Sequence, residues 1–105
     1  MRTLLTGGGG MLASSIADAW RERHGAAGLT VLTRRNVDLR DPVATRAAIA
    51  GANPDVVIHT AAHVGGIADK AARPLPYLLD NLLIDSAVLA AVVELGVSGF
   101  VYTGS

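Results

Sequence analysis

The sequence predicts an α/β protein built on a doubly wound parallel sheet in three αβα layers. Short apolar runs, typical of buried strands, alternate along the chain with longer segments of helical periodicity. The strand runs are apolar at consecutive positions rather than at alternate ones, which indicates strands covered on both faces. A helix between each pair of consecutive strands requires parallel pairing, and right-handed crossovers then give the doubly wound topology.

Four segments are expected to be strands because they are short and rich in aliphatic or β-branched residues. They are residues 2–6, 29–33, 55–62 and 99–105. A complete doubly wound sheet of this type has about six strands. The last strand would lie near the middle of such a sheet with one edge unpaired, which favours aggregation. We therefore expect residues 1–105 to be the N-terminal half of a domain in a longer protein.

Three helices are expected between these strands. In residues 11–24 the apolar residues recur at helical spacing and Gly25 follows as a stop; the expected core positions are Leu12, Ile16, Ala19 and Trp20. The second helix begins with Asp41 as N-cap and Pro42 at the first position, and Gly51 is its expected stop. Residues 77–96 are apolar on most faces, which predicts a largely buried helix after a loop over 63–76.

The composition excludes several classes of function. Nine basic and nine acidic residues cancel, so no net charge attracts nucleic acid or an anionic membrane. The chain has no cysteine, which excludes a disulfide framework and a thiolate metal site. No apolar run approaches the roughly 18 residues that cross a bilayer. Because the chain start also lacks a signal-peptide pattern, we expect a soluble, cytoplasmic protein. No second histidine or carboxylate lies at metal-ligand spacing around His63, so we expect no metal site.

Four consecutive glycines, residues 7–10, separate the first strand from the first helix. Two spacings fit a Rossmann-like dinucleotide-binding loop: Gly8, Gly10 and Ala13, or Gly7, Gly10 and Ala13. In either one an early glycine makes the turn, and Gly10 lets the backbone approach a pyrophosphate. Residue 13 must be small so that the helix packs closely on the strand. The pyrophosphate would then meet the helix N-terminus.

The end of the second strand indicates which dinucleotide binds. A carboxylate there binds the ribose hydroxyls of NAD, whereas an arginine suits the 2′-phosphate of NADP. The strand ends in Thr33-Arg34-Arg35, with no carboxylate before Asp38. NADP is therefore favoured over NAD, with Arg34 as its phosphate ligand and Arg35 as a solvated charge.

Three segments resemble the extended short-chain dehydrogenase/reductases of the epimerase/dehydratase type: "TGGGGMLASSIA", "VDLRD" and "VVIHTAAHVGGI". The resemblance spans the whole chain. The segments "AAHVGGI" and "NLLIDS" and the pair Gly10-Met11 look most like the branch that epimerises GDP-4-keto-6-deoxymannose and reduces its ketone with NADPH. The resemblance thus implies a GDP-linked sugar substrate and, for a full-length protein, a homodimer.

The resemblance also assigns residues to the cofactor and the substrate. The pyrophosphate cradle comprises Gly7, Gly8, Gly9, Gly10, Met11, Leu12 and Ala13. Asp38 and Leu39 would flank the adenine, and Arg34 would take the 2′-phosphate. The ribose and nicotinamide side would be lined by Ala61, Ala62, His63 and Gly104. Ser105 falls at the position of the family's catalytic serine.

The chain departs from the family pattern at three points. Ala13 replaces a glycine, and Gly9 stands where some members carry a phosphate-binding arginine. The Tyr-x-x-x-Lys pair that transfers the proton in this family would lie beyond Ser105. Tyr102 has no lysine four residues later, so we expect this chain alone to be inactive.

Two alternative functions stay open: an NAD-dependent sugar-nucleotide 4-epimerase or dehydratase, and a non-catalytic dinucleotide-binding module. His59 lies within an apolar strand and is expected to be buried and hydrogen-bonded, whereas His63 lies at a strand end where ligands bind. Tyr77 and Tyr102 are expected to be packing residues. Asn81 is either an ordinary polar position on a buried helix or a site residue.

Overall fold

A computed structural model of the chain describes residues 1–7, 10–25, 27–33, 35–60 and 74–103. Its elements follow in the order β1 (Thr3–Leu5), α1 (Met11–His24), β2 (Leu29–Val31), α2 (Pro42–Ala52), β3 (Val56–His59), α4 (Pro74–Glu94) and β4 (Gly99–Tyr102). The alternation of strands and helices predicted from the sequence is confirmed. The strands are shorter than the apolar runs that contain them.

The four strands form one parallel sheet in the order β2-β1-β3-β4. Leu4 of β1 is paired with Thr30 of β2 on one side and with Val57 of β3 on the other. The chain therefore leaves β1 in one direction and later returns to its opposite side, which is the reversal that defines a doubly wound sheet. β4 lies at an edge of the sheet and pairs with β3.

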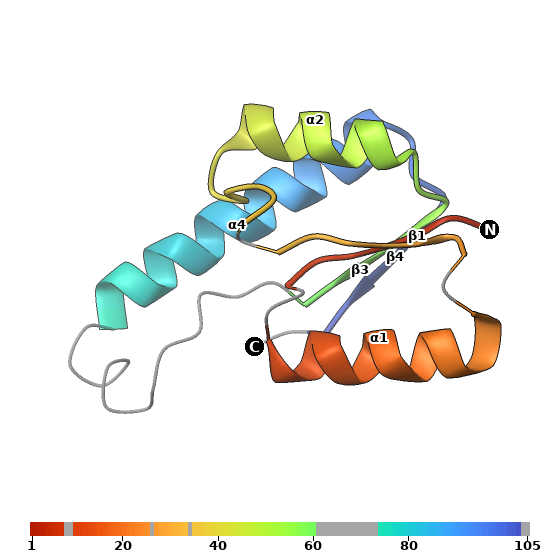
Figure 1. Cartoon of the computed structure of the whole chain (residues 1–105). Coiled ribbons are helices and arrows are strands. Elements are labelled where there is room, and N and C mark those ends of the chain that lie inside the picture. Colours follow the sequence, from red (N-terminus) through yellow and green to blue (C-terminus); the bar gives the residue numbers. More distant parts are fainter. Residues whose placement is uncertain (8–9, 26, 34, 61–73, 104–105) are drawn as a thin grey trace.

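Helices cover both faces of the sheet, as predicted: α1 lies on one face, and α2 and α4 lie together on the other (Figure 1). Two apolar clusters correspond to these layers. Leu5 packs with Ala13 and Ala17 beneath α1. Leu4 and Val57 pack with residues of α2 and α4, including Ile49 and Val88. Adjacent residues of β1 thus enter opposite cores, as the pleat requires.

The inward face of α1 differs from the prediction. Its buried residues are Ala13 and Ala17, whereas Leu12 and Ala19 are exposed. Ile16 and Trp20 are half-buried. The face is rotated by about one residue because the closest approach to the strand admits methyl side chains and not larger ones. The predicted helix bounds and the stop at Gly25 (φ 76°) are confirmed.

The start of α2 is as predicted, and its end is not. Asp41 is the N-cap, where its side chain accepts hydrogen bonds from the backbone N–H groups of Val43 and Ala44, and Pro42 is the first helical residue. Gly51, the expected stop, lies inside the helix. The helix ends instead at Asn53, whose left-handed conformation (φ 47°) lets its N–H bond to Ile49 and Ala50.

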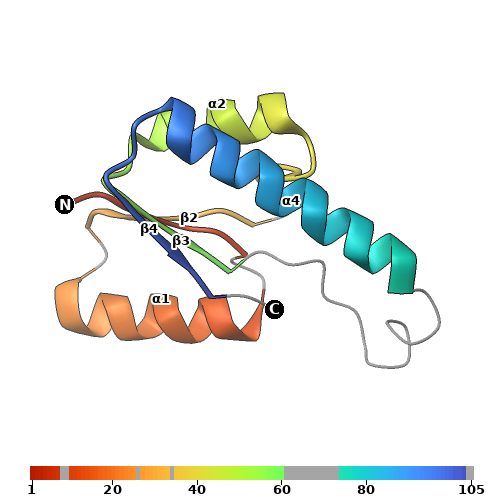
Figure 2. The ribbon, with the colours of Figure 1, turned by 180° about the vertical axis from the view of Figure 1, so that it is seen from behind.

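The expectation that the third helix is largely buried was wrong. α4 begins earlier than predicted, at Pro74, and its N-terminal half extends past the sheet (Figure 2). Its buried residues lie in the C-terminal half: Ile84, Ala87, Val88, Ala91 and Val92. Its exposed apolar residues are Leu75, Leu78, Leu79, Leu82, Leu83, Leu89 and Val93. One apolar stripe covers the sheet, and the other apolar positions face solvent because no described element packs there.

Enlarging Ala13 should destabilise the fold. We expect Ala13→Leu to lower the free energy of unfolding by about 1–3 kcal/mol, since its 1 % exposed side chain leaves no room for three more carbons. Ala19→Leu, on the exposed side of the same helix, should change it by less than about 0.5 kcal/mol. Urea unfolding followed by circular dichroism measures both. Equal losses would contradict the close packing of α1 on β1.

Candidate functional site

The reversal of chain direction at β1 makes the carboxyl ends of β1 and β3 the topological switch point of the sheet, where doubly wound sheets have their ligand crevice. In open α/β sheets this is the point where ligands bind, because the connecting segments leave the two strands on opposite faces. β1 runs through Thr6 into Gly7, β3 runs through His59 into Thr60, and α1 begins beside them (Figure 1). The described part of the glycine loop therefore lies where the sequence predicted a dinucleotide.

The two described glycines of the loop have different conformations. Gly7 has a φ of 75°, a conformation that other residues adopt at a cost. Gly10 is extended (φ −91°) and is the N-cap of α1. Its N–H donates to the carbonyl of Gly7 at 2.9 Å, which closes the turn. Gly7 thus makes the turn, in agreement with the spacing Gly7-Gly10-Ala13; Gly8 and Gly9 lie outside the described residues.

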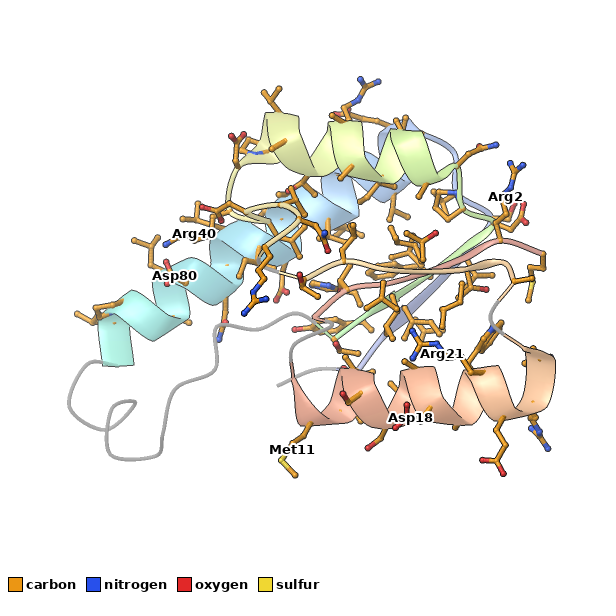
Figure 3. All side chains as sticks on the ribbon, viewed as in Figure 1. Arg2, Met11, Asp18, Arg21, Arg40 and Asp80 are labelled. Atoms are coloured by element: carbon orange, nitrogen blue, oxygen red, sulfur yellow. The ribbon has the colours of Figure 1, made fainter. Side chains whose placement is uncertain are left out.

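The N-terminus of α1 suits an anion. No side-chain hydrogen bond caps it, and its first turn has no acidic residue. The backbone N–H groups of residues 11–13 have no intrahelical acceptor, as in every first helical turn, and the helix dipole adds positive potential there. Met11 is 91 % exposed and points away from the sheet (Figure 3). Binding here would use backbone N–H groups rather than side chains.

Asp38, expected beside the adenine, is held by a residue that the sequence reasoning missed. The Arg40 guanidinium donates to both carboxylate oxygens of Asp38 at 3.0 Å, and its backbone N–H donates at the same distance. These bonds keep the pKa of Asp38 below its usual value. Arg40 also reaches Asp80 on α4 at 3.5 Å (Figure 3). Leu39 packs against the core cluster of α2 and α4.

The segment after β2 forms a compact turn. Asn36 accepts hydrogen bonds from the backbone N–H and the hydroxyl of Thr33. Arg35 is exposed, and its backbone N–H donates to the Thr33 hydroxyl. This turn fixes the direction in which the chain leaves the strand. Arg34, the predicted phosphate ligand, lies outside the described residues.

A buried polar chain joins the ends of β1 and β3. Thr6 Oγ1 lies 2.7 Å from His59 Nδ1 and accepts the backbone N–H of Thr60 at 3.1 Å. His59 is 1 % exposed. The expectation that His59 is buried and hydrogen-bonded is therefore confirmed.

Asp85 of α4 continues this chain. Its Oδ1 lies 2.8 Å from His59 Nε2, and its Oδ2 accepts the Tyr102 hydroxyl at 2.9 Å. The Tyr102 ring stacks on the His59 ring with centroids 5.6 Å apart. Tyr102 is thus a packing residue, as expected, and also a hydrogen-bond donor. One carboxylate links α4 to β3 and β4.

Burial determines the protonation of His59. Desolvation lowers the pKa of the ring below its ordinary value, and the hydrogen bond to Asp85 opposes this more weakly. The same carboxylate raises the pKa of the Tyr102 hydroxyl, which it holds in the protonated form. The site therefore contains a neutral histidine between a hydroxyl and a carboxylate.

Eight of the fifteen predicted site residues lie outside the described part of the chain: Gly8, Gly9, Arg34, Ala61, Ala62, His63, Gly104 and Ser105. Of those that are described, Gly7, Gly10, Met11, Leu12 and Ala13 lie together at the start of α1, whereas Asp38 bonds Arg40 and Leu39 packs with the cluster of α2 and α4. Asp85 and Arg40 were missed. Their signals were an isolated acid in the apolar run "LLIDSAV" and an Asp-x-Arg spacing in "VDLRD". Neither sequence pattern indicates which residue the side chain of Asp85 or Arg40 binds.

None of the helices in the described part of the chain is long and apolar enough to span a membrane. Within the same ranges, no three histidine, cysteine or acidic side chains are grouped as metal ligands.

Comparison with known proteins identifies the family. Residues 3–105 match the NAD dependent epimerase/dehydratase family. The chain belongs to this family, and its strand order and glycine loop agree with that.

Within this family, the chain is similar to proteins named as GDP-L-fucose synthases or synthetases. The chain is 32 % identical over 96 residues to a probable GDP-L-fucose synthase of Drosophila melanogaster, covering 90 % of this chain and 30 % of the relative. It is 38 % identical over 80 residues to the GDP-L-fucose synthase of Azorhizobium caulinodans, covering 76 % and 25 %. A crystal structure of a GDP-L-fucose synthetase from Naegleria fowleri bound to NADP superimposes with a TM-score of 0.78 at 26 % identity, covering 95 % and 29 %. The chain thus spans less than a third of the length of these proteins.

Gly7 and Gly10 should respond differently to a side chain. We expect Gly7→Ala to lower the free energy of unfolding by about 1–2 kcal/mol, because alanine is strained at a φ of 75°. Gly10→Ser should leave it unchanged or raise it, since serine is a good N-cap and its Cβ would lie 3.4 Å from the nearest atom, the Gly7 carbonyl oxygen. Thermal and urea unfolding measure both. A larger loss for Gly10→Ser would contradict the assignment of the turn to Gly7.

The stability of the chain should depend on the protonation of His59. Because its pKa is lower in the folded chain than the ordinary 6.5, the unfolded chain binds this proton more tightly. The free energy of unfolding should therefore fall as the pH drops below about 6.5, and level off below the folded-state pKa. Urea unfolding across this range, compared with His59→Gln, isolates the effect. An equally steep fall in the variant would show that another group causes it.

Proposed function

We propose that this chain is the cofactor-binding part of an NADP-dependent nucleotide-sugar epimerase/reductase similar to GDP-L-fucose synthase. The observation that carries the proposal is the Gly7 turn, followed by an N-terminus of α1 that no side chain caps, at the switch point of the sheet where β1 and β3 end. A dinucleotide pyrophosphate needs backbone N–H donors and a close approach at such a point. The relatives named as GDP-L-fucose synthases support the substrate class.

The residues present fit this cofactor. The N–H groups of the first turn of α1 would bind the pyrophosphate, and Arg34 would pair with the 2′-phosphate. Ala61, Ala62, His63 and Gly104 would face the nicotinamide side. When bound, NADPH supplies the hydride for reduction of the sugar ketone. Ser105 would donate a hydrogen bond to that ketone and so stabilise the charge that develops on its oxygen.

The state of Asp38 favours NADP over NAD. An NAD-selective site offers a free carboxylate to the ribose hydroxyls at the end of the second strand. Asp38 instead shares both of its carboxylate oxygens with Arg40. An NAD-dependent 4-epimerase or dehydratase is therefore the second candidate.

The exposed leucines of α4 support a homodimer of the complete protein, since large apolar patches commonly mark interfaces.

A cofactor titration tests this proposal. We expect the chain to bind NADPH more tightly than NADH in a fluorescence titration. Arg34→Ala should remove most of that preference, a loss of about tenfold or more in NADPH affinity, because a charge-assisted bond to phosphate is lost. The affinity for NADH should hardly change.

Two variants serve as controls. Arg35→Ala removes a neighbouring charge and should leave the preference intact. Gly10→Val should abolish binding of both dinucleotides, because a branched side chain blocks the approach to the helix N-terminus. No preference for NADPH in the unchanged chain would contradict NADP dependence, and no binding of either cofactor would contradict the site itself.

A further inference from the structure

His59 and Asp85 have no role in the proposed cofactor site, yet they lie directly behind it. Thr6 immediately precedes Gly7, and Thr60 immediately follows His59. Thr6 Oγ1 accepts the Thr60 N–H at 3.1 Å and lies 2.7 Å from His59 Nδ1. These contacts join the two strand ends that border the crevice. The Thr6 hydroxyl thus helps to hold the end of β1 against β3, together with the bond from the Thr6 N–H to the Ile58 carbonyl at 3.0 Å and the bond from the Thr60 hydroxyl to the Thr6 carbonyl.

The Thr6 hydroxyl can donate to His59 and accept from Thr60 at the same time in one tautomer of His59. When Nδ1 carries no proton, Thr6 donates to it and its oxygen stays free to accept from Thr60. When Nδ1 carries a proton, Thr6 must accept from both neighbours, and its own proton loses this acceptor. The second state changes the link between the strand ends, because the contact between Thr6 and the ring then runs from the ring N–H to the hydroxyl oxygen and the Thr6 O–H must turn away from the ring.

Asp85 selects between these states. An ionised carboxylate accepts hydrogen bonds and donates none. With Asp85 Oδ1 at 2.8 Å from Nε2, the proton of the neutral ring must lie on Nε2, which leaves Nδ1 as the acceptor for Thr6. Asp85 is itself fixed by the Tyr102 hydroxyl at 2.9 Å.

The groups that face His59 come from three elements. Asp85 comes from α4, Tyr102 comes from β4, and Thr6 follows β1. Among the described residues, Asp85 is the one charged side chain bonded to the ring. The aromatic rings of Phe100 and Tyr102, both on β4, stack on the His59 ring with centroids 6.3 and 5.6 Å away. The choice of tautomer therefore depends on Asp85 alone within this part of the chain.

We propose that Asp85 is a positioning residue for cofactor binding: it holds His59 in the Nε2–H tautomer, and His59 then holds Thr6 and the glycine loop against β3. This role rests on the proposed dinucleotide site. Asp85 is not expected to touch the cofactor.

The test compares two carboxylates of α4 in the full chain at about pH 8, where histidine is neutral. Asp85→Asn leaves the shape of the side chain but removes the charge that requires a donor at Nε2. We expect NADPH affinity to fall about tenfold, the effect of one weakened charge-assisted hydrogen bond. Glu94→Gln is the matched control, since Glu94 binds Arg46 of α2 at 2.9 Å, away from the crevice. It should bind NADPH like the unchanged chain.

Two further measurements distinguish positioning from general stability. Long-range ¹H–¹⁵N NMR reports the tautomer: we expect Nε2–H in the unchanged chain and in Glu94→Gln, and a shift toward Nδ1–H in Asp85→Asn. Tyr102→Phe removes the other hydrogen bond of Asp85 but leaves the carboxylate beside His59. It should therefore keep both the tautomer and the affinity.

The outcomes separate the two proposals. If the unchanged chain does not bind NADPH, the proposed function fails and the positioning role falls with it. If the unchanged chain binds NADPH and Asp85→Asn binds it equally well, the positioning role alone is wrong. If Asp85→Asn does not fold, an NMR pH titration of the unchanged chain tests the role instead. The amide signals of Gly7 and Thr60 should then shift with the same midpoint as the signals of the His59 ring. Signals that do not follow the ring would overturn the role.

Discussion

The pairing of β3 with the free side of β1 is the constraint on which the rest of the structure depends. Since β2 already occupies the other side of β1, this pairing reverses the direction of winding and makes the ends of β1 and β3 the switch point where doubly wound sheets bind ligands. It also aligns Leu5 with Ile58, so the next residues, Thr6 and His59, face each other on the side of α4. A sheet with β3 elsewhere would have neither the crevice nor the polar contact behind it.

The polar chain through His59 makes this register specific. Apolar side chains tolerate a shift of strand pairing if their total volume is kept, but buried hydrogen-bonding groups do not. A slip of one residue would turn His59 toward α1, away from both Thr6 and Asp85, and leave a buried ring without partners. The interaction thus stabilises one arrangement of the strand ends over alternatives, at the place where the backbone must be held for a ligand.

The two faces of the sheet use different packing solutions. Beneath α1, two alanines allow close contact, which places the helix N-terminus directly beside the Gly7 turn. On the other face, α2 and α4 pack larger aliphatic residues, and ion pairs such as Arg46–Glu94 tie the two helices at their exposed sides. The close face positions the anion-binding end of α1, and the thicker face supplies most of the buried apolar surface.

The sequence by itself determined the order of the elements, the start of α2 at Asp41-Pro42, the position of the glycine loop and the burial of His59. These features depend on local periodicity, capping chemistry and the apolar residues on either side. The close packing of α1 at Ala13 was also predicted from the sequence. The tertiary structure alone decided that Gly7 makes the turn, that Ala17 rather than Leu12 joins Ala13 in that contact, that α2 continues past Gly51 and that much of α4 is exposed. It also decided the partners of Asp85 and Arg40. Those of Asp85, His59 and Tyr102, are remote in the sequence, and Arg40 has several acidic residues within reach of its side chain. Local patterns determine which conformations a segment favours, whereas contacts between distant segments depend on how the sheet brings them together.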